Sequence, residues 1–449
     1  MKQEIVYVMM ALATASPLTL SAQEAKTWTL SECIRYALKQ NIQLRQNRLS
    51  LEESKVDVKT AKAALFPSLS FTTGHNVVNR PYQETSSMVN GTEIINSTNK
   101  TSYTGNYGLN AQWTVWNGGK RKNTIKQQKL NKEIAELTVS EQENTLKEEI
   151  TKLYIQVLYA EESVRINQGT LKLSNAQYER GEELLAAGEI SKSELAQLKS
   201  QVSNDQYLLV TAQTNLENYK LQLKQMLELE DNQNMNLDTL SINENDILSP
   251  LPAKKDVYQT ALALRPDIQS SKTEIQSADL NVRMAKAGYM PTVSLSAGIG
   301  TNHSSGSNFT FSEQVKNGWN NSIGLILSLP LFSNRETKSA IEKAKIQYES
   351  SQLDLTNAQK SLYKEIESIW LDASSAQQQF VAAESKLKSC RSSYELVNEQ
   401  FSLGMKNIIE LLTEKNNLMS AQQERIQAKY MALLNRTLLT FYSGKEIDL

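Results

Sequence analysis

The stretch YTGNYGLNAQWTVWNGGK, residues 103–120, decides the fold class. Its odd-numbered residues from Tyr103 to Val115 are mostly apolar or aromatic, whereas the even-numbered residues between them are Thr, Asn, Gln or Gly. A period of two is typical of a β-strand with one apolar and one polar face. The alternation stops at Asn-Gly-Gly, residues 117–119, which is a turn signal. The sequence therefore predicts a two-faced strand over 103–116.

The composition favours long elements joined by few turns. Only 17 of the 449 residues are Gly and 8 are Pro, the two residues that most often interrupt regular structure. The 48 Lys and Arg nearly balance the 49 Asp and Glu, which gives a net charge of -1. Because proteins that bind nucleic acid usually carry a basic surface, nucleic acid is not expected as a partner.

The first 22 residues have the features of a secretory signal peptide. A basic residue near the start precedes an apolar run from Ile5 to Leu20, and small residues follow at Ser21-Ala22. This order is typical of a signal peptide that is removed. A membrane anchor is the weaker alternative, because the run is short and is interrupted at Ser16-Pro17. We therefore expect export and cleavage near Ala22.

Beyond residue 22, no window approaches the ~18 apolar residues that a membrane-spanning helix needs. The mature chain is therefore either exported and soluble or spans a membrane as a β-barrel. The only two cysteines are Cys33 and Cys390, and neither directly follows the signal peptide, so no lipid anchor is expected. The two thiols either pair in an oxidising compartment or are buried separately on helices.

One pattern occurs twice in the chain. Residues 107–129 match residues 323–345, and the same offset aligns Gly188 with Gly404. A self-similarity of this length indicates two tandem copies of one structural unit, which we place at 23–250 and 251–449. Each copy is expected to contain a helix, two strands, a long helix and a further helix.

Periodicity places the elements of both copies. Pro67 and Pro291 each end a helix and begin a strand, because proline cannot continue a helical hydrogen-bond ladder. Alternation marks the strands, and heptad spacing with many small residues marks the long helices. Between paired strands, 79–102 and 303–318 are rich in Asn, Ser, Thr and Gly and are expected to be exposed loops. The expected elements are strands 67–78, 103–116, 291–302 and 319–331, long helices 118–187 and 334–403, and further helices 190–229 and 407–442.

The predicted strands are long enough to cross a membrane but cannot do so alone. Strand 103–116, at ~3.3 Å per residue and a tilt of ~45°, would cover a depth of ~33 Å. In lipid, the edges of an open sheet would leave backbone N–H and C=O groups without partners. Several chains must therefore close the sheet, and three copies would give twelve strands above twelve helical columns.

This ordered set resembles the TolC-type outer membrane efflux proteins. The resemblance covers residues 28–442 and rests on the strand ends VWNGGK and PLFSNR and on the turns AAGEISKSELAQLKS and SLGMKNIIELLTEKN. It implies a mixed α and β membrane protein, namely a homotrimeric twelve-stranded β-barrel in the outer membrane that continues into a long α-helical tunnel in the periplasm. It also implies docking onto a periplasmic adaptor protein and an inner-membrane transporter, with no cofactor and no enzyme activity.

The resemblance further implies where the tunnel opens and closes. In the family, the two helical hairpin tips form the periplasmic entrance, where an acidic residue after the second tip Gly contributes to a charged ring. An aromatic residue before that Gly and a basic residue after it help to hold the entrance shut. The corresponding gate and docking residues here are Gly188, Glu194, Phe401, Gly404, Lys406, Glu410 and Glu414.

A simpler interpretation of these residues remains open. The glycines would serve as helix C-caps in any case, and a glutamate in the first turn of a helix is favourable without any further role. Phe401 stands where the family has Tyr, and Glu410 stands where it has Asp, so the hydrogen bonds of the gate are expected to differ.

Two further functions are compatible with parts of the pattern. The same architecture serves as the exit duct of one-step protein secretion systems, and wall residues do not separate the two roles. A periplasmic coiled-coil scaffold without a pore is the alternative from another class, but four strands with an apolar face argue against it. We therefore expect an outer membrane efflux duct.

Chemistry-bearing side chains are sparse. The only histidines, His75 and His303, are expected to stand alone in a strand and a loop, and no motif for nucleophilic catalysis or phosphate binding occurs. Aromatic residues gather near the strand ends, which is typical of the aromatic girdle of a membrane barrel. By parity, Trp113 faces outward, whereas Trp116 is expected on the opposite face.

Overall fold

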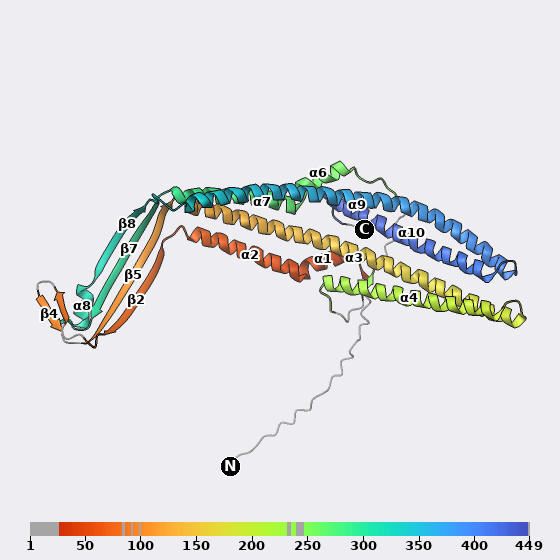
Figure 1. The fold of residues 1–449 in the computed structure, drawn as a ribbon, viewed down its shortest axis with the longest axis horizontal. Coiled ribbons are helices and arrows are strands. Elements are labelled where there is room, and N and C mark those ends of the chain that lie inside the picture. The colour runs from red at the N-terminus through yellow and green to blue at the C-terminus, as the bar shows by residue number, and fades with distance from the viewer. Residues whose placement is uncertain are drawn as a thin grey trace, which may run out of the picture.

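The protein is elongated, with a β-sheet at one end and long helices that lead away from it (Figure 1). The computed structural model describes residues 27–82, 86–90, 93–97, 100–230, 235–238 and 247–447. The expected signal peptide, 1–22, lies outside the described residues. Among the helices that the structure describes, none combines the length and the apolar character needed to cross a membrane.

The main sheet has four antiparallel strands in the order β2-β5-β7-β8. Its central pair, β5 and β7, is hydrogen-bonded on both sides, so β2 and β8 form the two edges. In one cross-strand row, Phe71 of β2 pairs with Leu109 of β5, which pairs with Ile299 of β7. The strands are β2 (Ser68–Asn79), β5 (Thr101–Asn117), β7 (Thr292–Ser304) and β8 (Asn320–Ser328).

One face of this sheet is apolar and is not covered by the rest of the chain. Cross-strand pairing aligns Leu295 with both Trp113 and Leu325, because paired residues lie on the same face of a sheet. Leu325 keeps 70% of its surface exposed, and Ile323 keeps 79%. An exposed apolar face of this extent marks an interaction with lipid or protein.

A β-bulge places Trp116 on a different face from the one that parity predicts. The register shifts between Thr114 and Trp116, so that Trp116 pairs with Val293. The extra residue, Val115, reverses the alternation at the end of the strand. The expectation that Trp116 faces away from Trp113 is therefore wrong, and Trp116 lies on the apolar face.

Strand β8 is shorter than the sequence predicts. It ends at Ser328, because Pro330 has no N–H with which to continue a ladder. The side chains of Leu329 and Leu331 are therefore outside the strand, where both are exposed.

The two segments expected to be loops contain regular structure. Segment 79–102 includes the antiparallel pair β3 (Ser86–Asn90) and β4 (Glu93–Ser97), and Asn-Gly at 90–91 is a hairpin signal in the sequence. Segment 303–318 contains helix α8 (Phe311–Asn317). Thr310 and Glu313 begin this helix with a capping box, which stabilises a short helix at its N-terminus.

The two histidines do not stand alone. His303 lies within β7 rather than in a loop, and its ring centroid is 6.4 Å from that of His75. The Tyr103 hydroxyl lies 2.6 Å from Nδ1 of His75, and the Tyr107 ring stacks on His303. These four rings form one aromatic cluster at the end of the sheet away from the long helices, over the backbone of Gly105.

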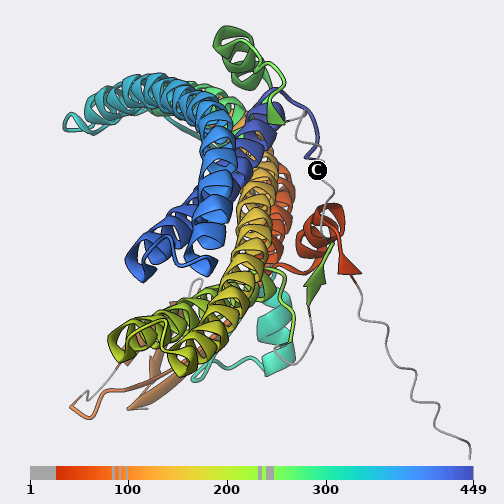
Figure 2. The same cartoon turned by 90° about the vertical axis from the view of Figure 1, so that its right-hand side faces the viewer.

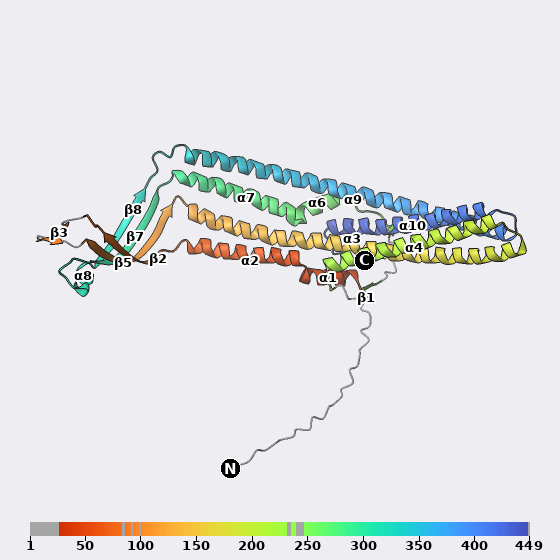
Figure 3. The same ribbon diagram turned by 60° about the horizontal axis from the view of Figure 1, so that its bottom comes forward.

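Each strand of the sheet continues into one helical column, and the columns keep the order of the strands (Figure 3). Helix α2 leads into β2, β5 leads into α3, α7 leads into β7, and β8 leads into α9. Helices α3 and α9 are each ~100 Å long at 1.5 Å per residue. Their bounds are α2 (Ile42–Ala63), α3 (Lys120–Ala187), α7 (Pro266–Lys286) and α9 (Glu336–Ser402).

Two further helices complete the columns at the far end. Helix α4 (Lys192–Met226) returns along α3, and α10 (Ile408–Tyr442) returns along α9. Viewed from that end, the two hairpins lie as separate pairs (Figure 2). The remaining elements are β1 (Thr27–Trp28), α1 (Leu30–Gln40), β6 (Asn236–Leu237), α6 (Lys254–Leu264) and the 3₁₀ turn η1 (Ala287–Tyr289).

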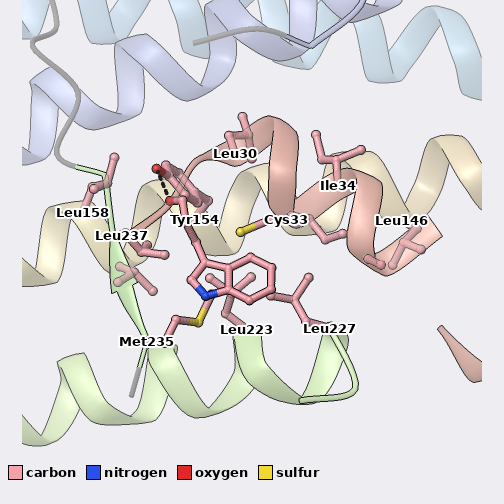
Figure 4. Close-up of a cluster of buried hydrophobic side chains, with 14 of the residues drawn as sticks. Leu30, Cys33, Ile34, Leu146, Tyr154, Leu158, Leu223, Leu227, Met235 and Leu237 are labelled. Carbon is pink, nitrogen blue, oxygen red and sulfur yellow. Dashed lines mark hydrogen bonds between the residues drawn. The ribbon is translucent and has the colours of Figure 1, made fainter. Parts of the chain in front are cut away.

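The largest buried cluster lies where α1, α3 and the end of α4 meet (Figure 4). Cys33, Tyr154 and Leu223 are fully buried there. The Tyr154 hydroxyl lies 3.0 Å from the carbonyl oxygen of Asp238, which ties the parallel pair β1 and β6 to α3. Cys390 lies far along α9 and is only half-buried.

The turns from strand to long helix have the same backbone conformation in both halves. Gly118 and Gly119 have φ values of 66° and 80°, and the aligned Asn334 and Arg335 have values of 45° and 68°. Left-handed backbone costs a non-glycine residue about 1 kcal/mol or more. The second half therefore adopts a strained turn that the first half makes with glycine.

We predict that Gly118→Ala destabilises the protein more than Gly119→Ala does. Both substitutions force alanine into left-handed backbone, at a cost of about 1 kcal/mol. A Cβ at Gly118 would lie 2.7 Å from the Cβ of Met290, whereas at Gly119 nothing lies within 4 Å, so Gly118→Ala adds about 1–3 kcal/mol of overpacking. The midpoint of thermal unfolding of the purified variants measures this, and equal midpoints would contradict the packing argument.

Candidate functional site

The candidate site consists of the two hairpin turns at the end of the molecule away from the sheet (Figure 1). Gly188 joins α3 to α4 with φ of 78°, and Gly404 joins α9 to α10 with φ of 73°. The N–H of the residue after each glycine donates back over the last helical turn, from Glu189 to Leu184 at 2.9 Å and from Met405 to Gln400 at 2.8 Å. Both glycines therefore end their helices in left-handed backbone, Gly188 as the C-cap of α3 and Gly404 directly after Leu403, the C-cap of α9.

Glu194 and Glu410 close matching capping boxes at the start of the return helices. The backbone N–H of Ser191 donates to the Glu194 carboxylate at 2.7 Å, and that of Asn407 donates to Glu410 at 3.2 Å. The two caps align with each other at the offset of the sequence repeat. In the single chain, each glutamate therefore holds a helix end in place.

Lys406 and Glu410 form an ion pair on the second tip. The Lys406 Nζ lies 2.5 Å from Oε1 of Glu410. The hydrogen bond from Lys406 and that from the Asn407 backbone hold the pKa of Glu410 below its usual value. On the first tip, the backbone N–H and hydroxyl of Ser191 likewise lower the pKa of Glu194. Both carboxylates are thus stabilised in their charged form.

Phe401 is anchored in an apolar cluster that joins the two hairpins. The cluster is built on four buried residues, Leu198 of α4, Tyr394 of α9, and Ile408 and Leu411 of α10. Phe401 packs against it as a partly buried residue. We call this set the tip cluster. Phe401 therefore helps to set the position of one hairpin against the other.

A buried polar triad lies beside the tip cluster and was not foreseen from the sequence. Lys415 of α10 forms an ion pair with Asp205 of α4, and the Ser174 hydroxyl of α3 hydrogen-bonds to both. The side chains of Lys415 and Asp205 are 2% and 1% exposed. Burial lowers the pKa of Lys415. This triad connects three helices from both hairpins.

The repeat offers a reason why the triad is hard to find in the sequence. Lys199 is the residue aligned with Lys415 in the repeat, yet Lys199 is exposed on α4. A lysine in a helix among polar residues normally stays solvated. Only the tertiary packing of α10 against α3 and α4 buries one lysine of the pair and leaves the other in water.

Glu414, the last of the predicted site residues, contacts its own helix. Glu414 is half-buried and accepts a hydrogen bond of 3.4 Å from Asn417 on its own helix. Within the described part of the chain, no group of three or more His, Cys, Asp or Glu side chains could hold a metal ion.

We predict that Lys415→Met lowers the free energy of unfolding by about 3–5 kcal/mol, because it leaves Asp205 charged and buried without an opposite charge. The double variant Lys415→Met with Asp205→Leu is expected to recover most of this loss, since an apolar pair of similar volume often replaces a buried ion pair without cost. Denaturant unfolding of the purified protein measures both.

Lys199→Met serves as the matched control for Lys415→Met. It removes the aligned lysine from an exposed position, so its effect is expected to stay within about 0.5 kcal/mol. A double variant as unstable as Lys415→Met alone would show that the ion pair is not what the site requires.

A model of a known protein family matches both halves of the chain. The family model described as "Outer membrane efflux protein" matches residues 33–228 and 257–445. The outer membrane efflux protein BepC of Brucella suis is 22% identical over 437 residues, which cover 95% of this chain and 89% of BepC. The alkaline protease secretion protein AprF of Pseudomonas aeruginosa is 28% identical over 209 residues, only 46% of this chain and 43% of AprF.

Solved structures agree with the fold along nearly the whole chain. The structure of CusC superposes with a TM-score of 0.79 at 19% identity and covers 93% of this chain and 92% of CusC. The outer membrane protein VceC from Vibrio cholerae gives a TM-score of 0.77 at 17% identity and covers 93% of this chain and 97% of VceC. With the family model matched over both halves, the chain belongs to the outer membrane efflux protein family.

Proposed function

We propose that three copies of this chain form a passive exit duct of a tripartite efflux system. The observation that carries the proposal is a four-stranded sheet with an uncovered apolar face and two unpaired edges, in which every strand continues into a helical column. In the outer membrane, β8 of one copy would pair with β2 of the next, which satisfies the edge backbone groups that lipid cannot. Three copies would close a twelve-stranded barrel above a twelve-column tunnel.

The polar face of the sheet would line the channel. Residues such as Ser70, Asn110 and Ser322 occupy cross-strand positions opposite in face to the apolar rows, and their hydroxyl and amide groups would be hydrated in the lumen. A duct of this kind needs no bond chemistry, so its residues only have to pass a solute delivered by an inner-membrane transporter through a periplasmic adaptor.

The tips would form both the gate and the docking surface of the duct. Leu403, Met405 and Ile409 are exposed apolar residues around the second tip, and such residues fit burial against a partner protein. Threefold symmetry would bring at least three copies of Glu410 to one narrow opening. Glu194, Lys406 and Glu414 would add to the charge pattern there.

The two halves of the chain would derive from a tandem duplication, 23–250 and 251–449. The same order of strand pair, long helix and returning helix occurs in both. The tip glycines, the capping boxes and the turn conformations recur at the offset of the sequence repeat. A duplicated unit explains how one chain supplies two hairpins of equal reach.

A strain that lacks this chain distinguishes a role in efflux from a role in protein secretion. We expect loss of this chain to sensitise the native cell to small toxic compounds, while the set of secreted proteins stays unchanged. Wild-type chain and Ser322→Lys, on the channel face, are expected to restore resistance. Leu325→Lys is expected to fail, because a lysine on the lipid face near mid-membrane costs about 2–4 kcal/mol.

Native mass determination of the detergent-extracted protein provides the control for assembly, with three chains expected for the wild type and for Ser322→Lys. Loss of secreted proteins without loss of resistance would replace efflux by secretion. A water-soluble single chain in the wild type would overturn the duct itself.

We predict that Glu410→Gln reduces the cation selectivity of the channel and weakens its block by multivalent cations about tenfold, because it removes a carboxylate from each copy at the constriction. Glutamine keeps the capping box intact, so a change reports charge rather than a frayed helix. Single-channel conductance in planar bilayers measures it.

Glu349→Gln, on the exposed surface of α9, is the matched control for Glu410→Gln and is expected to leave conductance unchanged. Selectivity and block that are identical in Glu410→Gln and wild type would remove Glu410 from the gate while leaving the duct in place.

A further inference from the structure

The four helical columns carry a dense band of positive charge immediately next to the sheet. The band covers residues 55–66 of α2 and its end, 118–130 of α3, 279–290 of α7 and η1, and 333–346 of α9. These segments contain fourteen Lys and Arg but four Asp and Glu, a net charge of +10, whereas the whole chain has a net charge of -1. We call this set the cationic belt.

Most of the belt is exposed and not engaged in ion pairs. Among the described residues, the ion pairs formed by the belt are those of Lys55 with Glu52, Arg283 with Asp279, and Arg335 with Glu342. On α3, Lys120, Lys122, Lys126 and Lys129 are all exposed and form no ion pair with another described residue. These charges are therefore available to an external partner.

The dipole of helix α3 does not explain its share of the belt. Lys120, Arg121 and Lys122 are the first three residues of α3, and no acidic residue lies in its first turn. The N-terminus of a helix carries a partial positive charge and favours acidic side chains. Arg121 is accounted for within the chain, because it donates a hydrogen bond of 2.6 Å to the Ala64 carbonyl oxygen at the end of α2. Lys120 and Lys122 are unfavourable for the isolated helix, so their advantage has to come from outside it.

The other end of the same helices has the opposite charge. Residues 179–199 and 395–414 around the two tips contain nine glutamates but only four Lys and Arg. The charge is therefore polarised along the molecule, and the belt is not a general property of these helices.

An exposed apolar collar lies where the belt segments meet the sheet. Phe66 precedes β2, Tyr289 and Met290 precede β7, and Phe332 follows β8, and all four side chains are more than half exposed or at that limit. Trp116 adds an aromatic ring at the end of β5. Along the molecule, the apolar face of the sheet is thus followed by the apolar collar and then by the cations of the belt. This order matches the hydrocarbon core, the interface and the phosphate layer of a bilayer.

A hollow within the belt combines cations with apolar walls. It has a volume of about 580 Å³ between α3, α7 and α9, and its lining includes Lys126, Lys129, Leu130, Leu280 and Tyr348, together with Arg283 and its ion-pair partner Asp279. Such a surface can hold a phosphate at its charged side and part of an acyl chain or glycerol against its apolar side.

We propose that the cationic belt binds the headgroups of anionic phospholipids in the periplasmic leaflet of the outer membrane. The inference rests on the barrel of the proposed function, because the barrel sets the belt at the level of the headgroups. The headgroup layer adds several ångströms beyond the hydrocarbon core, and Lys120 to Lys126 span ~9 Å of helix. The belt thereby fixes the depth of the duct in the membrane and gathers anionic lipid around it.

The test compares lipid binding by the full chain and by two variants in detergent. The belt variant combines Lys120→Gln, Lys122→Gln, Lys126→Gln and Lys129→Gln. The control variant combines Lys152→Gln, Lys172→Gln, Lys192→Gln and Lys199→Gln, which removes the same charge from exposed positions of α3 and α4 outside the belt. Each protein is titrated with phosphatidylglycerol or phosphatidylcholine, and native mass spectrometry counts the lipids that stay bound.

We expect wild type and control to prefer phosphatidylglycerol at least ~10-fold, the belt variant to lose this preference, and about 0.5 M salt to suppress it. A belt variant that keeps the preference, or a control variant that loses it equally, overturns the proposal, as does inorganic phosphate that competes as well as the lipid. Conductance of the belt variant in planar bilayers shows whether the duct itself forms, so failure of the belt and failure of the proposed function are distinguishable.

Discussion

The unsatisfied backbone at the edges of the four-stranded sheet is the constraint on which the rest of the structure depends. Edge strands β2 and β8 each present a row of N–H and C=O groups on a sheet whose one face is apolar. In water the apolar face is unfavourable, and in lipid the edges are unfavourable. In the proposed duct, closure with other copies would satisfy both, and closure of the sheet would require the helical columns that continue its strands to close as well.

The long helices follow from the same constraint. Since each strand leads into one column, the lateral order β2-β5-β7-β8 is transmitted to α2, α3, α7 and α9. The turns that make this connection have to adopt left-handed backbone, which Gly118 and Gly119 do without strain and which Arg335 does at a cost. The long helices therefore keep the lateral order of the strands along their length.

The elements of this fold could be predicted from sequence wherever one local rule decided them. Pro67 and Pro291 placed the helix-to-strand boundaries, and alternation placed the four strands. Where the pairing with a neighbouring strand also matters, the structure differs from the prediction. The bulge at Val115 reverses the alternation and moves Trp116 to the apolar face. Parity counted along one strand cannot detect a bulge, because a bulge is defined by the register of the partner strand.

The candidate site shows the same limit. The tip glycines and the capping boxes of Glu194 and Glu410 are local features, and their residue types indicate them directly. The meeting of His75 with His303 and the burial of Lys415 depend on contacts between the two halves of the chain, and no periodicity within one helix or strand contains that information.

The buried triad adds an argument about how the two hairpins can differ. The backbones of the tips are alike in both halves, each with a left-handed glycine and a capping box closed by a glutamate. Lys415 is buried against Asp205, whereas the aligned Lys199 is solvated. A buried ion pair is costly to separate, because each charge would lose its partner before it regained water. If the hairpins move relative to each other at the tips, α10 must therefore either stay packed against α4 at this ion pair or let water reach the two charges. Alike backbones with unequal side chains thus give the two hairpins one shared buried polar contact near their tips.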